Sequence, residues 1–277
     1  MIHNRCCHLS CPQCEIAGNI VLDSKSTRIE KAFCSNCGYN LPVHEGIPDF
    51  ASHVPLMDSR LRPIQKLNQS PVFSVCYESA VWRTFLTRLG SGISMKDELE
   101  RVLSLAGNGN IETVADLACG TGHYARAFSR KYPGALVYGL DISLSMLTRG
   151  RNLARRNNLT SILFLRGDIY RLPFEDHSID RVNCCGALHL FSNVRPIWRE
   201  ISRILRPGGV FTGWTLYLKP GLEERLQRRM MEKGLASFFQ PDQLGDDLKQ
   251  AGLTHFHCER ERLWLIFSAS KIRTGVL

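Results

Sequence analysis

The chain has 277 residues, a formal net charge of +9 and 44% hydrophobic side chains. This composition excludes a chain that is disordered throughout, because it supplies enough apolar surface for a sizeable core. The length fits one large α/β domain with a small appendage. No apolar run approaches the roughly 18 residues of a membrane-spanning helix, and the polar start does not resemble a signal peptide. We therefore expect a soluble, cytoplasmic protein.

Two pairs of cysteines near the start of the chain have the spacing of a metal site. Cys11 and Cys14 form one C-x2-C pair, and Cys34 and Cys37 form a second pair, separated from the first by 19 residues. Two such turns can present four thiolates to one ion, which is the closed tetrahedral shell of structural zinc. The segment 20–33 between the pairs is predicted to form a β-hairpin, so the whole resembles a zinc ribbon.

The chain has eleven cysteines in all, and a reducing compartment with a metal site explains this number better than a disulfide framework. Redox chemistry of a dithiol is the alternative, but no βαβ pattern surrounds either pair. Cys6, Cys7 and His8 stay unassigned, because they would exceed the four ligands of a tetrahedron.

The hydrophobic pattern divides the chain into three parts. Residues 1–50 are predicted to form the ribbon module, and residues 51–110 a linker with entry or lid helices at 72–89 and 95–105. Residues 111–277 alternate short β-rich runs with helical stretches, which indicates a parallel sheet with crossover helices. We predict strands at 113–119, 135–142, 161–167, 180–188, 209–217, 254–260 and 263–271. The last two are separated only by a tight turn and must therefore pair antiparallel.

The carboxyl ends of the first three predicted strands carry polar and glycine residues that suit a nucleoside. Gly120 and Gly122 follow the first strand and allow a ligand to approach the backbone closely. The third glycine of a dinucleotide fingerprint is missing, because Ala125 stands in its place. Asp141 ends the second strand, where a carboxylate can bind two ribose hydroxyls. Asp168 places a second acid at the same edge, so a nucleoside ligand is predicted without a phosphate-binding lysine.

These segments resemble class I S-adenosylmethionine-dependent methyltransferases. The resemblance lies in residues 114–122, 139–147 and 166–174, and residues 187–189 and 200–211 resemble the ubiquinone/menaquinone-type branch, methyltransferase type 11. It covers residues 72–271 and implies a Rossmann-like α/β fold, with a seven-stranded sheet whose last strand pair is antiparallel. It also implies a transferase with S-adenosylmethionine as its cofactor and, with the ribbon, a structural zinc ion.

The resemblance assigns roles to individual residues. Asp116, Ala118, Gly120 and Gly122 would line the methionine end of the cofactor. Asp141 would hold the ribose, and Asp168 would accept from the adenine amino group. The remaining implied cofactor contacts are Ile142, Met146, Ile169, Cys185, Tyr77 and Arg83, the last two on a lid. A turn or helix-cap role is the alternative for Asp168, and packing of an entry helix is the alternative for Tyr77.

His189, just beyond the fourth predicted strand, is the candidate general base. A base is required only if the acceptor is a hydroxyl, an amide or a carbon acid, and His189 could equally serve only to shape the pocket.

Cys184 and Cys185 lack the proline of cytosine-C5 methyltransferases, so small buried residues are the favoured interpretation. The apolar stretch 221–239, within a possible cap at 221–251, would cover the substrate, although a methionine pair on a helix is more often plain core.

These patterns favour a methyltransferase that acts on oxygen or carbon of a hydrophobic small molecule, quinone-like or a secondary metabolite. The first alternative is a ribosomal RNA guanine-N1 methyltransferase, which has the same order of modules. Residues 111–220 hold 15 basic and 8 acidic side chains, and four of the arginines lie on one predicted helix: Arg149, Arg151, Arg155 and Arg156. However, no aromatic residues interleave them, and the second metal pair of such enzymes is typically Cys and His rather than Cys34 and Cys37.

A non-catalytic cofactor-binding subunit is the second alternative, and the complete set of predicted cofactor residues disfavours it. The acceptor, the atom methylated and the oligomeric state are left open by the sequence.

Overall fold

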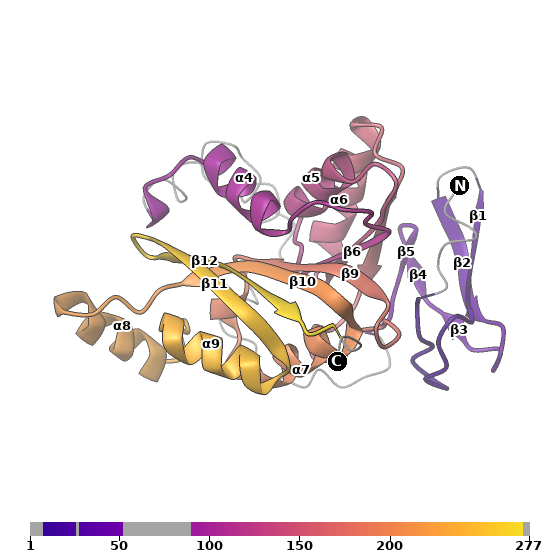
Figure 1. The fold of residues 1–277 in the computed structure, drawn as a ribbon. Helices are drawn as coiled ribbons and strands as arrows, with labels where there is room; N and C mark the ends of the chain where they lie inside the picture. Colours follow the sequence, from indigo (N-terminus) through magenta and orange to yellow (C-terminus); the bar gives the residue numbers. More distant parts are fainter. Residues whose placement is uncertain (1–7, 26–27, 52–89, 274–277) are drawn as a thin grey trace.

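The computed structural model describes residues 8–25, 28–51 and 90–273. A central sheet lies between two layers of helices, and a small β-module lies at one end of it (Figure 1). The predicted helix at 72–89, with Tyr77 and Arg83, lies outside the described residues, as do Cys6 and Cys7.

The central sheet has seven strands in the order β11-β12-β10-β9-β6-β7-β8. All neighbours from β10 to β8 pair parallel, whereas β12 pairs antiparallel with both β10 and β11. The predicted α/β class, the seven strands and the antiparallel pair at the end of the chain are thereby confirmed. The strands are β6 (Thr113–Leu117), β7 (Leu136–Asp141), β8 (Ile162–Arg166), β9 (Ile179–Cys185), β10 (Leu205–Leu216), β11 (Leu253–Glu261) and β12 (Trp264–Lys271).

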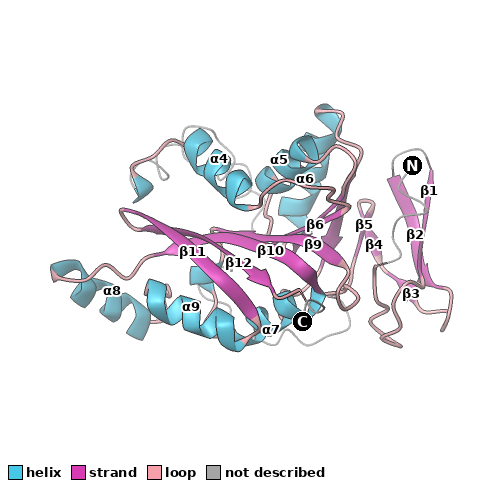
Figure 2. Ribbon diagram, viewed as in Figure 1, coloured by secondary structure: helices cyan, strands magenta, loops and turns pink. Residues whose placement is uncertain are grey.

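Helices α4, α5 and α6 cover one face of the sheet, and α7, α8 and α9 lie on the other (Figure 2). Local signals set where they begin: α4 starts with a capping box between Ser94 and Asp97, and the Ser143 side chain caps α6. Proline lies in the first turn of both α7 and α9. The helices are α4 (Met95–Leu105), α5 (His123–Lys131), α6 (Leu144–Arg156), α7 (Arg195–Ile204), α8 (Leu222–Glu232) and α9 (Pro241–Gln250).

One strand boundary differs from its prediction in a way that affects the site. The apolar run 180–188 predicts a strand as far as Leu188, but β9 ends at Cys185. Gly186 has a φ of +72°, and a Cβ there would lie 2.6 Å from the Trp214 ring. The chain therefore turns at Gly186, and Leu188–Leu190 form a short 3-10 helix, η1. This turn directs the residues after β9 across the carboxyl edge of the sheet.

The N-terminal module consists of a hairpin and three very short strands. β1 (Ile20–Lys25) and β2 (Arg28–Cys34) form the hairpin predicted between the cysteine pairs, followed by β3 (Asn40–Leu41), β4 (Val43–His44) and β5 (Ile47–Pro48). The module lies at one side of the molecule (Figure 1), and its residue Asp49 forms a bridge with Arg166 of β8, the edge strand of the central sheet. Its buried residues, such as Leu9, Leu22 and Phe50, belong to the same core cluster as Leu140 and Leu165 of the sheet. No helix among the described residues is both long and apolar enough to cross a membrane.

Candidate functional site

The loop that joins β6 to α5 holds a strained backbone at the carboxyl edge of the sheet. Ala118, Gly120 and Gly122 all have positive φ, of +49°, +54° and +71°. Such a conformation costs on the order of 1–3 kcal/mol at a residue other than glycine and clusters at ligand sites. Gly122 is required by packing as well, because a Cβ there would lie 2.7 Å from the Phe164 ring. The glycines of this loop have no side chains that could separate the backbone from a ligand bound over it.

Asp116 fixes this loop from below. Its side chain is 1% exposed, and its two oxygens accept hydrogen bonds from Ala125 N at 2.9 Å and from Asn183 Nδ2 at 2.7 Å. The first bond ties the start of α5 to β6, and the second ties β6 to β9. Asp116 thus lies beneath the loop with both oxygens bonded to protein donors.

Asp141 is the last residue of β7 and points toward the same loop. One carboxylate oxygen accepts from Gly120 N at 2.7 Å and the other from Ser143 N at 2.8 Å. Burial raises the pKa of Asp141 above its ordinary value, against the opposing effect of these backbone hydrogen bonds. An ionised carboxylate has about four acceptor positions. Two therefore remain for hydroxyl donors of a ligand.

Asp168 follows β8 and lies in a tight turn. Its Oδ1 accepts from Tyr170 N at 3.0 Å, and residue 168 forms an isolated antiparallel bridge with Arg171. The turn interpretation of this residue therefore has support, while Oδ2 has no hydrogen-bond partner within the described part of the chain. Ile169 and Met146 are both buried, whereas Ile142 is half-buried between the Asp141 and Ser143 positions.

The edge has features that fit an adenosine-type ligand. A Cβ on Gly120 would meet nothing within 4 Å, so the loop faces open space. Thr121 in the same loop is 1% exposed, and its Oγ1 has no hydrogen-bond partner among the described residues. Asp141 ends β7 and Asp168 lies two residues after the end of β8, and these adjacent strands pair in register through Asp141 and Arg166. The residues at this edge thus fit the cofactor implied by the resemblance.

The end of β9 carries the residues expected beside the methyl acceptor. Cys184 is fully buried and Cys185 half-buried, and burial raises the pKa of both thiols. The Cys185 thiol donates to Asn183 Oδ1 at 3.2 Å. Buried thiols with raised pKa values are poor nucleophiles, as the sequence indicated. His189 lies on η1, where its ring stacks with Trp214 at 6.1 Å between centroids.

The predicted cap contacts the His189 segment through its last residues. Ser237 N donates to the His189 carbonyl at 2.8 Å, and Ser237 Oγ donates to the Phe191 carbonyl at 2.9 Å. Leu218, Ala236 and Phe238 form a small buried cluster, against which Met230 packs. Met231, which follows Met230 on α8, is exposed, and so are Leu226 and Leu235.

The four paired cysteines of the N-terminal module lie close together. All four Sγ atoms lie within 4.8 Å of one another, with Cys11 to Cys37 at 3.7 Å and Cys14 to Cys34 at 3.8 Å. Four thiolates about 2.3 Å from a tetrahedral zinc ion lie about 3.8 Å apart, so this cluster fits zinc. A backbone hydrogen bond from Ile16 lowers the pKa of Cys14 to about 7, whereas burial raises that of Cys11 to about 12. A bound cation would favour the thiolate form of all four.

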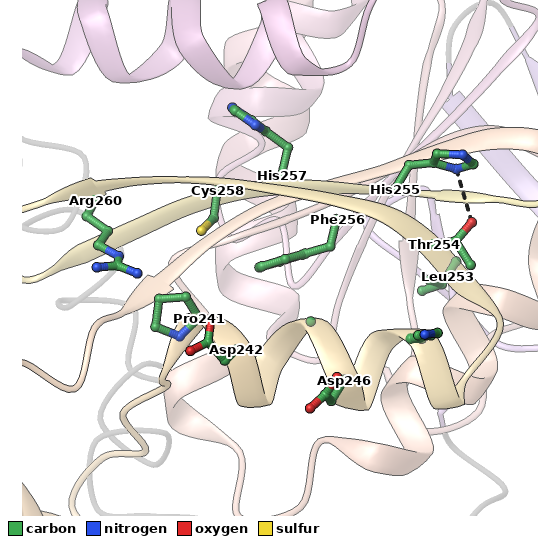
Figure 3. A pocket seen from close by; sticks show the side chains of 12 residues that line it. Pro241, Asp242, Asp246, Leu253, Thr254, His255, Phe256, His257, Cys258 and Arg260 are labelled. Atoms are coloured by element: carbon green, nitrogen blue, oxygen red, sulfur yellow. Dashed lines mark hydrogen bonds between the residues drawn. The ribbon is translucent and has the colours of Figure 1, made fainter.

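A groove of about 600 Å³ lies between α9 and β11 (Figure 3), away from the ends of β6, β7 and β8. His255, His257 and Cys258 project from β11, and Asp242 and Asp246 from α9 (Figure 3). Because β12, β10, β9 and β6 separate β11 from β7, this groove is not the predicted cofactor site.

Several residues that organise the site were not singled out from the sequence. Asn183 is fully buried in β9, binds Asp116, and accepts from Thr212 Oγ1 at 3.1 Å. An asparagine inside an apolar strand was the signal that could have identified it, since buried amides need partners. Trp214 was also missed; its Nε1 donates to Tyr124 Oη at 2.8 Å, and its ring stacks on Trp264. That arrangement depends on strands distant in sequence and carries no local signal.

Comparisons with known proteins agree with this geometry. Residues 115–212 match a family model described as a methyltransferase domain. An uncharacterized chloroplastic methyltransferase of Arabidopsis thaliana is 30% identical, over 86% of this chain and 69% of that protein. The chain therefore spans about two thirds of the length of this plant relative.

Two further similarities cover more than half of the chain. A demethylmenaquinone methyltransferase of Thermotoga maritima is 30% identical, over 55% of this chain and 75% of that protein. A solved structure of phosphoethanolamine N-methyltransferase 2 from Haemonchus contortus, in complex with S-adenosyl-L-methionine, superposes with a TM-score of 0.62 at 17% identity. That superposition covers 79% of this chain and 62% of the other and shows a shared fold.

Proposed function

The chain belongs to the S-adenosylmethionine-dependent methyltransferases, and we propose that it methylates an oxygen or carbon atom of a hydrophobic small molecule. The observation that carries the proposal is the position of His189 on η1, directly after the carboxyl end of β9, where the His189 carbonyl accepts a hydrogen bond from Ser237 of segment 221–239. A quinone-like acceptor is one member of this class. The demethylmenaquinone methyltransferase of Thermotoga maritima supports it by similarity alone.

The cofactor would lie across the ends of β6, β7 and β8. The two acceptor positions that remain on Asp141 would bind the two ribose hydroxyls, and Asp168 Oδ2 would accept from the adenine amino group. Ile142 and Met146 would pack the adenine ring, and Ile169 N would donate to it. The methionine end would lie over the 118–122 loop, where a Cβ on Gly120 would meet nothing within 4 Å.

Bound S-adenosylmethionine supplies an activated methyl group, so the protein mainly has to position the acceptor and exclude water. His189 would accept the proton that a hydroxyl or carbon acid loses as the methyl group arrives. Trp214, stacked against His189, and Phe238, in the segment bonded to the His189 carbonyl, would provide apolar surface for the acceptor. Zinc in the ribbon would be structural, because the four thiolates leave no open coordination position.

The pairing of basic residues disfavours an RNA acceptor. Of the 15 basic residues in 111–220, six form ion pairs with carboxylates of the described part of the chain: Arg166, Arg171, Arg195, Arg203, Arg206 and Lys219. Arg151 on α6 packs over Gly46 of the ribbon instead of facing solvent as part of a basic stripe. A phosphate-binding surface needs unpaired cations, and these contacts leave fewer basic side chains in this segment for that use.

A methyl-transfer assay separates the two acceptor classes. The zinc-loaded protein is incubated with radiolabelled S-adenosylmethionine and, in parallel, a prenylated hydroquinone, a long-chain fatty acid and a 23S ribosomal RNA fragment. We expect label in one of the organic-extractable products, with none in the RNA. Label in the RNA, together with binding that weakens steeply above about 50 mM salt, would replace the proposal with the RNA alternative.

The cytoplasmic location stays a prediction, and the Arabidopsis relative is named as chloroplastic.

A further inference from the structure

The ribbon module is bonded to the chain on both sides of the Asp168 turn. Its residue Asp49 forms a parallel bridge with Arg166 at the end of β8, and Phe50 N donates to the Arg166 carbonyl at 2.8 Å. Residues 8–10 pair with the segment after Asp168, through an antiparallel bridge between Leu9 and Phe174. The ribbon thus covers the exposed edge of the sheet on both sides of the Asp168 turn.

Arg166 joins the ribbon to the turn after Asp141. Its Nη1 donates to Asp49 Oδ2 at 2.7 Å, and its Nε donates to the Ile142 carbonyl at 3.1 Å. Asp49 is fully buried, and its other oxygen accepts from Ala51 N at 2.8 Å. His44 Nε2 lies 3.4 Å from the same carboxylate. A planar guanidinium can make both contacts at once in a fixed geometry, which a lysine cannot do.

We propose that Arg166, held by Asp49 of the ribbon, is a positioning residue that fixes the Asp141–Ser143 turn for cofactor binding. The inference rests on the placement of adenosine proposed above. Gly167 N donates to the Asp141 carbonyl at 3.0 Å, so the turns after β7 and β8 are already bonded to each other, and Arg166 adds the link to the ribbon. The ribbon is then part of the adenosine site, although none of its residues needs to touch the cofactor.

Coupling between the ribbon and the cofactor site must be reciprocal. When the folded ribbon favours cofactor binding, bound cofactor must favour the folded, metal-loaded ribbon by the same factor. A purely structural role for the Asp49–Arg166 pair would lower stability but would not make the two binding events depend on each other. This reciprocity gives a readout that does not depend on the unidentified acceptor.

The test compares Arg166→Met and Arg166→Lys with Arg206→Met. Arg206 is a matched control, because its side chain is 30% exposed against 31% for Arg166, and it pairs with Asp180 at 2.9 Å near the amino end of the sheet. Calorimetry with S-adenosylhomocysteine should show a Kd raised roughly 5- to 150-fold in both Arg166 variants, the usual range of coupling between sites. Arg206→Met should bind as the wild type does.

A double-mutant cycle with Asp49→Asn tests whether the two residues act together. We expect the double variant Asp49→Asn/Arg166→Met to bind no more weakly than Arg166→Met alone. Bound S-adenosylhomocysteine should also slow the loss of zinc to a chelator in the wild type and in Arg206→Met, but not in the Arg166 variants.

Unchanged Kd values in folded, zinc-loaded Arg166→Lys would overturn the inference and leave the cofactor site standing. Equal affinity losses in Arg206→Met and the Arg166 variants would overturn it as well, since the effect would then be general destabilisation. If the wild type binds no S-adenosylhomocysteine, the proposed cofactor site fails and this inference fails with it.

Discussion

The two halves of the site edge differ in how firmly they are built. The adenosine half, at the ends of β7 and β8, has Asp141 bonded to two backbone donors and is joined to the ribbon through Arg166. In the acceptor half, the segment 221–239 contributes Ala236 and Phe238 to a buried cluster that has three members among the described residues, the third being Leu218, and Leu226 of α8 is 63% exposed. Segments with few buried contacts open at lower free-energy cost than a bonded core.

The difference fits the two tasks that we propose. The adenosine part of the cofactor is the same in every catalytic cycle, so a rigid binding site is sufficient for it. An apolar acceptor has to enter and its product has to leave, which requires a part of the molecule that can open. The exposed apolar residues of α8 are therefore interpreted as surface that contacts the acceptor.

The largest expected effect is on the ribbon that supports the adenosine half. Cys11→Ser removes one of four thiolates whose zinc site, in small metal modules, contributes folding free energy of about 10–16 kcal/mol. We expect bound zinc, measured by atomic absorption, to fall from about one ion per chain to well below one. Cys258→Ser, on β11, should keep the zinc. Full zinc content in both variants would show that the cysteine cluster does not hold the ion.

The next largest effect tests the acceptor half. His189→Gln should lower kcat for an acceptor found in the transfer assay by about 10²–10⁴-fold, the usual contribution of a general base, with little change in cofactor affinity. His257→Gln, on the distant strand β11, is the control. A rise in KM with an unchanged kcat would mean that His189 shapes the pocket and moves no proton.

Asp141→Asn should weaken S-adenosylhomocysteine binding by about 10- to 100-fold, because charge-assisted hydrogen bonds contribute roughly 1.5–3 kcal/mol each. Calorimetry measures the change, and Asp246→Asn on α9 serves as the control. An affinity equal to that of the wild type would remove Asp141 from the cofactor site.

The raised pKa of Asp141 predicts a pH dependence with a definite sign. Ribose hydroxyls donate to the ionised carboxylate, so protonation removes the favoured acceptor and Kd must rise as the pH falls through the pKa of Asp141. Since burial raises this pKa above the ordinary 3.8, the rise should begin at a higher pH than for an exposed aspartate. It should be absent in Asp141→Asn, and a pH-independent Kd in the wild type would contradict the prediction.

The two halves also differ in what the sequence could predict. Asp141, Asp168 and the 118–122 loop lie at strand ends that hydrophobic patterning identifies, and parallel strands bring such ends to one edge. The C-x2-C spacing of the cysteine pairs is a local signal, so the cluster of Cys11, Cys14, Cys34 and Cys37 could be predicted without knowledge of the fold. Local chemistry was enough for both.

Contacts between distant segments were not predictable in this way. The Asp49–Arg166 pair joins residues 117 positions apart, and nothing near either residue indicates the other. The end of β9 was placed too late because Cys185 to Leu188 looks like a continuing strand, whereas Gly186 has a positive φ and the Trp214 ring of β10 leaves no room for a side chain there. Such features depend on packing that exists only after the chain has folded.

The smallest expected effect concerns α8. Leu226→Lys places a charge on a side chain that is 63% exposed, so the free energy of unfolding should change by less than about 0.5 kcal/mol. If Leu226 contacts the acceptor, KM should rise about 3- to 10-fold with kcat unchanged, because losing a small apolar contact in a pocket corresponds to about 1 kcal/mol or slightly more. Ile272→Lys, at a side chain that is 54% exposed beyond the end of β12, should change neither quantity. Equal KM values in both variants would mean that the exposed residues of α8 do not contact the acceptor, and the contrast between the two halves would then lie in stability alone.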